Sequence, residues 1–132
     1  MTLGARGRPP TIDPVTAIRL LHNPQCSKSR TALDLLQAAG ADTEVVRYID
    51  TPPTRAELEH IVDHADVEPA ALVRKDARFK ELGLDPADYV ERDAVVELLL
   101  AHPRLMERPV AVKGDRVVMG RPPENVTSLL ED

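Results

Sequence analysis

The sequence is poor in the residue types on which several classes of protein depend. It has a single cysteine, no tryptophan, two tyrosines and one phenylalanine. One cysteine rules out an internal disulfide framework, a Cys-x-x-Cys redox pair and any multi-cysteine metal site. So few aromatic side chains leave no stacking platform for nucleic-acid bases, and the formal net charge of −5 opposes a basic nucleic-acid surface. We therefore expect no nucleic-acid partner.

Long hydrophobic runs are missing too. No apolar stretch approaches the ~20 residues that span a bilayer, and the N-terminus lacks the apolar core of a signal peptide. We expect a cytoplasmic monomer with no membrane association. The 132 residues, 42% of them hydrophobic and 30% charged, are typical of one globular domain. Residues 1–14, rich in glycine, proline and arginine, are predicted to be a flexible extension, and residues 15–132 the single folded domain.

The cysteine lies in a stretch typical of a strand-to-helix turn. An apolar run at 17–21 precedes His-Asn-Pro-Gln-Cys-Ser-Lys-Ser-Arg at 22–30, and an amphipathic run at 32–39 follows. Pro24 has no N–H to donate, so it ends the strand. Residues 27–30 then form the first helical turn, whose unpaired backbone N–H groups favour an anion.

A thiolate at such a turn is strongly favoured. Lys28 and Arg30 add positive charge, and His22 lies one loop-width away. These groups are expected to lower the pKa of Cys26 from about 8.5 into the roughly 3.5–7.5 range of activated thiols. We therefore interpret Cys26 as a nucleophile rather than as a buried structural cysteine.

Two residues near Cys26 each have two possible roles. Ser29 either donates a hydrogen bond to the thiolate or caps the helix. Arg30 either contributes to an anion site or pairs with Asp34 four residues on, the second being slightly favoured.

The hydrophobic pattern predicts a mixed α/β domain. The expected elements, in chain order, are a strand at 15–21, a helix at 27–39, a strand at 44–49, three or four helices between 54 and 101, a hairpin at 110–119 and a final helix ending near Leu130. Thr-Arg-Ala-Glu at 54–57 is predicted to form a capping box at the start of a helix, and Gly114-Asp115 to form the hairpin turn. A β-α-β start gives two parallel strands, and the hairpin adds antiparallel ones. This is the layout of a thioredoxin-like mixed sheet flanked by helices, with a helical insertion between its β-α-β half and its β-hairpin-α half.

Three arginines stand out beyond the cysteine turn. Arg74 lies within the insertion, whereas Arg108 and Arg121 each directly precede a proline, which holds their backbone extended. In this topology the segment entering the hairpin passes close to the cysteine turn, which brings Arg108 within reach of Cys26. Guanidinium groups match a tetrahedral oxyanion bidentately. Each arginine alone is better read as a surface charge paired with a carboxylate such as Glu107, but three at points that can converge favour a site.

One histidine pair has the spacing of metal ligands. His60 and His64 are four residues apart on one predicted helix, but no His-Glu-x-x-His pattern and no obvious third partner accompanies them. We therefore expect solvated histidines and no metal site.

Taken together, these motifs resemble the glutaredoxin-coupled arsenate reductase family. The resemblance extends from about residue 16 to the end and rests on five segments in order: residues 22–30, Tyr-Ile-Asp-Thr-Pro-Pro at 48–53, Leu-Val-Arg-Lys at 72–75, Arg-Pro-Val at 108–110 and Arg-Pro at 121–122.

The resemblance implies an enzyme in which Cys26 attacks arsenate. It assigns oxyanion binding to Arg74, Arg108 and Arg121, and makes His22 a group that helps to lower the pKa of Cys26. No cofactor is bound in this reading; glutathione or another low-molecular thiol is the co-substrate, and a glutaredoxin is the protein partner.

Other functions remain open. A monothiol oxidoreductase acting on glutathione mixed disulfides would share the Cys26 turn without needing Arg74 and Arg121. A thiol-responsive regulator that binds RNA polymerase is less favoured, because such proteins usually carry Cys-x-x-Cys and position 29 is serine. A cysteine phosphatase is disfavoured because its phosphate loop requires arginine six positions after cysteine, where this chain has Ala32.

Overall fold

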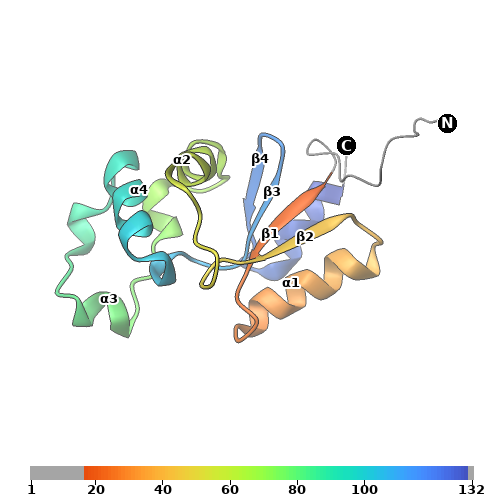
Figure 1. Ribbon diagram of the computed structural model, residues 1–132, viewed down its shortest axis with the longest axis horizontal. Helices are drawn as coiled ribbons and strands as arrows, with labels where there is room; N and C mark the ends of the chain where they lie inside the picture. The colour runs from red at the N-terminus through yellow and green to blue at the C-terminus, as the bar shows by residue number, and fades with distance from the viewer. Residues whose placement is uncertain (1–16, 131–132) are drawn as a thin grey trace.

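The computed structural model describes residues 17–130, and the predicted extension at 1–14 lies outside that range (Figure 1). The elements in chain order are β1 (Ile18–His22), α1 (Ser27–Ala38), β2 (Thr43–Arg47), α2 (Arg55–His64), η1 (Pro69–Leu72), α3 (Ala77–Glu81), η2 (Pro86–Asp88), α4 (Arg92–Ala101), η3 (Pro103–Leu105), β3 (Val110–Lys113), β4 (Arg116–Met119) and η4 (Pro123–Leu130), where η denotes a 3-10 helix. The predicted order of a β-α-β unit, a helical insertion, a hairpin and a final helix is confirmed.

The four strands form one mixed sheet in the order β2-β1-β3-β4. β1 pairs in parallel with β2 and antiparallel with β3, while β3 and β4 form the hairpin about Gly114, whose φ of 60° suits a tight turn. Leu21 lies opposite Val110. The loop that leaves β1 therefore meets the segment that enters β3, at one end of the sheet.

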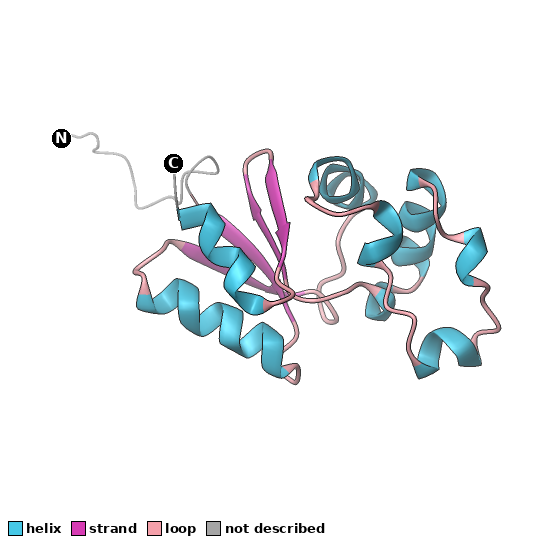
Figure 2. Ribbon diagram, turned by 180° about the vertical axis from the view of Figure 1, so that it is seen from behind, coloured by secondary structure: helices cyan, strands magenta, loops and turns pink. Residues whose placement is uncertain are grey.

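The sheet separates two hydrophobic cores. Leu20, Ala111 and Val118 face the layer formed by α1 and η4, whereas their neighbours Leu21, Val110 and Val117 face α2 and the rest of the insertion. Figure 2 shows α1 and η4 together on one side of the strands and the insertion helices on the other. Both faces are covered, which explains why these strands are apolar at successive positions.

Local hydrogen bonds set several boundaries. β2 ends at Arg47 rather than at the expected residue 49, because the Arg47 carbonyl accepts from Asp50 and Thr51 and turns the chain. The Thr54 side chain caps α2 by accepting from the backbone N–H of Glu57 at 3.2 Å. The Glu57 carboxylate does not complete a reciprocal capping box, since it pairs with Arg19 of β1. No helix within residues 17–130 combines the length and apolar character needed to cross a bilayer.

Candidate active site

The cysteine turn is a compact proline turn that delivers Cys26 to the start of α1. The Cys26 N–H donates to the Asn23 carbonyl at 3.0 Å, with Pro24 at the second position, and the Asn23 side chain accepts from the Gln25 N–H at 2.9 Å. Cys26 is the N-cap residue, with extended backbone angles of −96° and 122°. Its half-exposed sulfur therefore lies beside the unpaired N–H groups of the first helical turn.

These surroundings lower the pKa of the Cys26 thiol. Burial alone would raise that pKa, but the backbone N–H groups of Ser29 and Lys28 and the guanidinium of Arg108 favour the charged form and outweigh burial. The thiolate is the nucleophilic form of cysteine, so the site is arranged to keep its sulfur reactive.

Ser29 and His22 stabilise the cysteine turn from its buried side. The buried Ser29 hydroxyl accepts from the Asn23 N–H at 3.0 Å and bonds to Nδ1 of His22 at 2.6 Å. Burial, reinforced by Arg47 and Arg30, lowers the pKa of His22, which keeps the imidazole neutral. The Ser29 hydroxyl thus stabilises the turn and does not cap α1, while the backbone N–H of Ser29 favours the Cys26 thiolate. A direct role for His22 in the ionisation of Cys26 stays a prediction.

Arg30 also serves the turn. Its Nη1 donates to the Pro24 carbonyl at 2.8 Å rather than to Asp34. This bond ties the first turn of α1 back to the loop before Cys26.

Arg108 and Arg121 lie close together beside the sulfur. Nη2 of Arg121 is 3.9 Å from Sγ of Cys26, and Nε of Arg121 donates to the Arg108 carbonyl at 3.0 Å. The guanidinium of Arg108 faces the sulfur and raises the stability of the thiolate. Both arginines precede a cis peptide bond, to Pro109 and to Pro122.

Arg74 joins this group through a shared carboxylate. Glu107 Oε1 lies 3.4 Å from Nη1 of Arg74 and 3.3 Å from Nε of Arg121. Val73 pairs with Met106 in an antiparallel bridge, and the Glu107 N–H donates to the Leu72 carbonyl at 2.8 Å, so the two segments run side by side. Asp76 also pairs with Arg74 at 3.1 Å, so two carboxylates face three guanidinium groups and the group keeps an excess of positive charge. The three predicted arginines are therefore one connected group.

Gly120 permits the close approach of the two arginine-bearing segments. Its N–H donates to the Pro109 carbonyl at 2.8 Å. A Cβ at this position would lie 2.6 Å from Cγ of Pro109 and 3.1 Å from Cγ1 of Val126. Only glycine fits between these groups without a shift.

Tyr48 supports Arg108 from the hydrophobic core. The tyrosine is fully buried, and its hydroxyl donates to the Met106 carbonyl at 3.3 Å. Burial raises the pKa of Tyr48, which therefore stays neutral and keeps its proton for that bond, while its oxygen faces Arg108. Nε of Arg108 is buried with no hydrogen-bond partner among residues 17–130. The described residues thus leave a buried donor close to the Cys26 sulfur without an acceptor.

Sequence reasoning missed the supporting residues. The sequence suggests Glu107 only as a surface partner of an arginine, and it indicates no role for Tyr48 or Gly120 in the site. The signal for Glu107 and Gly120 was their position, each directly before an arginine that precedes a proline. Nothing in the local sequence indicates that Tyr48 reaches Arg108.

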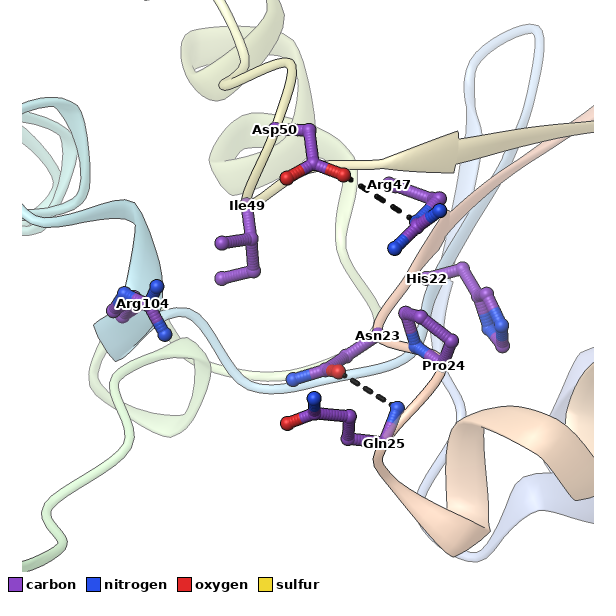
Figure 3. Close-up of a pocket in the computed structure, with 8 residues that line it drawn as sticks. All are labelled: His22, Asn23, Pro24, Gln25, Arg47, Ile49, Asp50 and Arg104. Atoms are coloured by element: carbon purple, nitrogen blue, oxygen red, sulfur yellow. Dashed lines mark hydrogen bonds and ion pairs between the residues drawn. The ribbon is translucent and has the colours of Figure 1, made fainter.

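An open cleft of about 200 Å³ lies beside the cysteine turn (Figure 3). It is lined by the four residues before Cys26, by Arg47, Ile49 and Asp50 after β2, and by Arg104 of η3. Arg47 is paired with Asp50 at 3.4 Å, but the exposed guanidinium of Arg104 has no bonded partner within residues 17–130. Lys75, by contrast, donates to the carbonyls of Ala70 and Val73. Of Arg104 and Lys75, only Arg104 has no bonded partner among the described residues, so its guanidinium is available to a ligand.

Comparison with known proteins identifies the family of this chain. Residues 21–129 match the ArsC family, from the end of β1 almost to the end of η4. The chain belongs to the ArsC family. It is 43% identical over 115 residues to the arsenate reductase of Neisseria meningitidis serogroup A, covering 86% of this chain and 97% of the relative. It is also 36% identical to the uncharacterized protein YfgD of Escherichia coli K12, covering 86% and 96% of the two chains.

Solved structures agree with the ArsC assignment. The arsenate reductase from Vibrio cholerae superposes with a TM-score of 0.77 at 35% identity, covering 87% of this chain and 98% of that one. The α/β architecture is thus the thioredoxin-like fold of this family. The matched range includes Cys26 and all three arginines of the site.

Proposed function

We propose that this ArsC-family protein reduces arsenate to arsenite with Cys26 as its nucleophile. The observation that carries the proposal is the connected group of Arg74, Arg108 and Arg121 beside a cysteine whose pKa is lowered. The arsenate reductases of N. meningitidis and V. cholerae, similar over nearly their whole lengths, support the choice of arsenate as the oxyanion.

Arsenate binds as a tetrahedral oxyanion among the three guanidinium groups. Planar N–H pairs match pairs of its oxygens, and the unpartnered Nε of Arg108 gains an acceptor. The Cys26 thiolate then attacks arsenic. A thiol–arsenic bond forms, an As–O bond breaks, and the departing oxygen leaves as water after taking up protons. The guanidinium groups offset the negative charge that develops on the remaining oxygens.

Reduction requires a second thiol, because the chain has one cysteine. Glutathione, or another low-molecular thiol, attacks the adduct. The two electrons released when a sulfur–sulfur bond forms between glutathione and Cys26 convert As(V) to As(III), which leaves as arsenite. A glutaredoxin then restores the Cys26 thiolate by thiol–disulfide exchange.

The cleft beside the turn is a fitting entrance for this thiol. Glutathione carries two carboxylates, and Arg104 presents an unpaired guanidinium on the wall opposite Asn23 and Gln25. We expect Arg104→Ala to raise the KM for glutathione several-fold and to leave the KM for arsenate unchanged. Arg55→Ala, which removes an exposed guanidinium of α2, is the matched control.

The decisive experiment combines the purified protein with arsenate, glutathione and glutaredoxin, and follows arsenite. Turnover is expected for the natural chain and none for Cys26→Ser. Lack of turnover by the natural chain, or turnover that survives Cys26→Ser, would reject the proposal.

A second assay separates this function from a monothiol oxidoreductase. The Arg74→Ala/Arg121→Ala double variant should lose arsenate reduction while still exchanging glutathione mixed disulfides. Natural protein that exchanges mixed disulfides but does not reduce arsenate would establish the oxidoreductase instead.

A further inference from the structure

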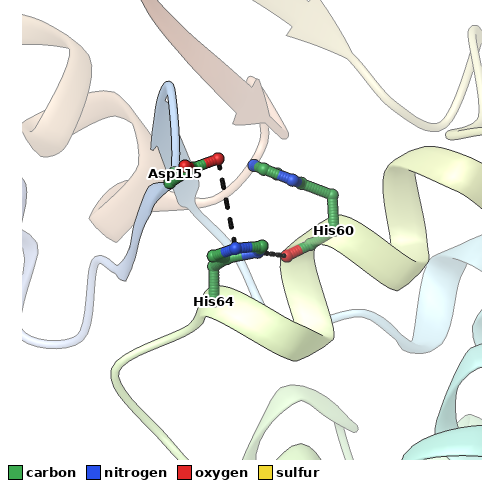
Figure 4. Close-up of side chains that lie close together, drawn as sticks. All are labelled: His60, His64 and Asp115. Carbon is green, nitrogen blue, oxygen red and sulfur yellow. Dashed lines mark hydrogen bonds and ion pairs between the residues drawn. The ribbon is translucent and has the colours of Figure 1, made fainter.

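A second cluster of ligand-type side chains lies far from Cys26 along the sheet. His60 and His64 project from the last two turns of α2, and Asp115 lies in the turn between β3 and β4 (Figure 4). Each of the three offers one ligand atom, and these atoms lie within 4.8 Å of one another. The third partner that the local sequence does not reveal is thus supplied by a distant turn.

Hydrogen bonds orient both imidazole rings. Nδ1 of His64 lies 2.9 Å from the His60 carbonyl, and Nε2 of His60 lies 2.7 Å from the Gly114 carbonyl. A carbonyl only accepts, so these two nitrogens donate, and in the neutral form that binds a metal the other nitrogen of each ring has a free lone pair. For His64 that atom is Nε2, which is 4.0 Å from Oδ1 of Asp115. Histidines that bind metals are commonly held in this way, with the second nitrogen donating to a carbonyl.

The two elements that carry the cluster are fixed relative to each other. Ala65, the residue after α2, forms a parallel bridge with Val117 of β4. The Asp66 N–H donates to the Val117 carbonyl at 3.2 Å, and the Asp66 side chain accepts from the Met119 N–H at 3.2 Å. The backbone segments that carry the three side chains are therefore held together, so that only side-chain rotation is needed to complete the site.

We propose that His60, His64 and Asp115 bind a divalent transition-metal ion of the Zn²⁺ type. Two imidazoles and a carboxylate form a donor set that Zn²⁺ accepts, with water at the fourth position. Bonds of about 2.0–2.1 Å place tetrahedral ligands roughly 3.3–3.5 Å apart. Rotation of the exposed His64 and Asp115 side chains closes the remaining gap. The bound ion would connect the insertion helix α2 to the hairpin.

This site is separate from the proposed reaction centre. Leu21 pairs with Val110 and Arg19 with Val112, so β3 runs away from the cysteine turn toward Gly114. Cys26 follows one end of β1, and the metal ligands lie beyond the other end. Metal binding therefore neither depends on the proposed function nor tests it. Because a thiolate also binds Zn²⁺, the measurement needs a background without the Cys26 sulfur.

The test is calorimetric titration of untagged Cys26→Ser protein with ZnCl₂, and with MgCl₂ as the hard-cation comparison. One Zn²⁺ per chain is expected, and no Mg²⁺ binding. His64→Ala in the same background should weaken Zn²⁺ binding at least ~10-fold, and Asp115→Asn should also weaken it. His102→Ala, which removes the histidine after α4, is the matched control and should bind as before.

A thermal melt gives an independent reading. Zn²⁺ should raise the melting temperature of the Cys26→Ser protein and of the His102→Ala control but not that of the His64→Ala variant. Circular dichroism checks that each variant folds. Absence of Zn²⁺ binding in the Cys26→Ser background, or equal binding after the His60→Ala/His64→Ala double change, would overturn the proposal.

Discussion

The arginines grouped beside the sulfur of Cys26 are arranged differently from those on the surface between α2 and α4. On that surface each arginine has carboxylates of its own: Arg55 pairs with Glu97, and Arg92 pairs with both Asp63 and Asp93. Beside Cys26, by contrast, Arg108 has no carboxylate partner within residues 17–130, and its Nε is buried without an acceptor. These surface ion pairs are largely exposed, so they contribute little to the stability of the fold. The positive charge of Arg108 is therefore available to the thiolate and to an incoming anion.

The largest expected effect comes from removing the arginine without a carboxylate. Arg108→Ala should lower kcat/KM for arsenate by about 10²–10³-fold, the loss typical when a preorganised donor to a developing oxyanion is removed. Arg92→Ala removes a better-paired guanidinium from the surface and should leave kcat/KM unchanged. Steady-state arsenite production by both variants makes the comparison. If both variants lost kcat/KM equally, the lack of a carboxylate partner at Arg108 would have no bearing on activity.

The next effect concerns the shared carboxylate. Glu107→Gln removes the charge that orients Arg74 and Arg121 but makes the surroundings of these arginines more positive. We therefore expect kcat to fall about 10-fold through lost alignment, without a rise in the KM for arsenate. Glu97→Gln, which breaks the pair with Arg55, should change neither constant. A higher KM with an unchanged kcat would show that Glu107 acts on binding rather than on alignment.

The parts of the fold that were predictable are those with local signals. Pro24 marks the end of β1, Thr54 caps α2, and Gly114-Asp115 marks the hairpin turn; each lies where the structure has that feature. The end of β2 was placed two residues late, because the turn that stops it depends on hydrogen bonds to the Arg47 carbonyl rather than on a turn-forming residue. The final helix was foreseen, but its 3-10 geometry was not.

The site also has a part that local sequence predicts and a part that depends on contacts between distant segments. The cysteine turn is contained within residues 22–30, so its chemistry could be reasoned from the sequence. The link between Arg74 and Arg121 could not, because it depends on Val73 pairing with Met106, 33 residues away, which brings Glu107 between the two arginines. His60, His64 and Asp115 show the same limit, since their proximity depends on how α2 docks against β4.

A smaller effect concerns the pH dependence of Cys26. Because its pKa is lowered in the fold, alkylation by iodoacetamide should persist below the pH at which an ordinary thiol stops reacting, and should fall as the pH drops through that lowered pKa. Arg108→Ala removes one cause of the shift, so its profile should move to higher pH and its alkylation at pH 7 should be slower. Arg92→Ala should leave the profile in place. A profile for Arg108→Ala that coincides with that of the natural chain would contradict the stabilisation of the Cys26 thiolate by Arg108.

The smallest effect should come from the tyrosine hydroxyl behind Arg108. Tyr48→Phe leaves the buried Met106 carbonyl without its donor, which should cost about 1–3 kcal/mol in the free energy of unfolding. The guanidinium keeps its other surroundings, so kcat/KM for arsenate should fall only a few-fold. Tyr89→Phe, in the insertion, removes a hydroxyl with no bonded partner among the described residues and should change neither quantity. Urea unfolding and arsenite assays on the two variants separate the roles. If Tyr48→Phe lost as much activity as Arg108→Ala, the hydroxyl would itself contact the oxyanion, and Tyr48 would belong to the anion-binding group rather than to the hydrophobic core.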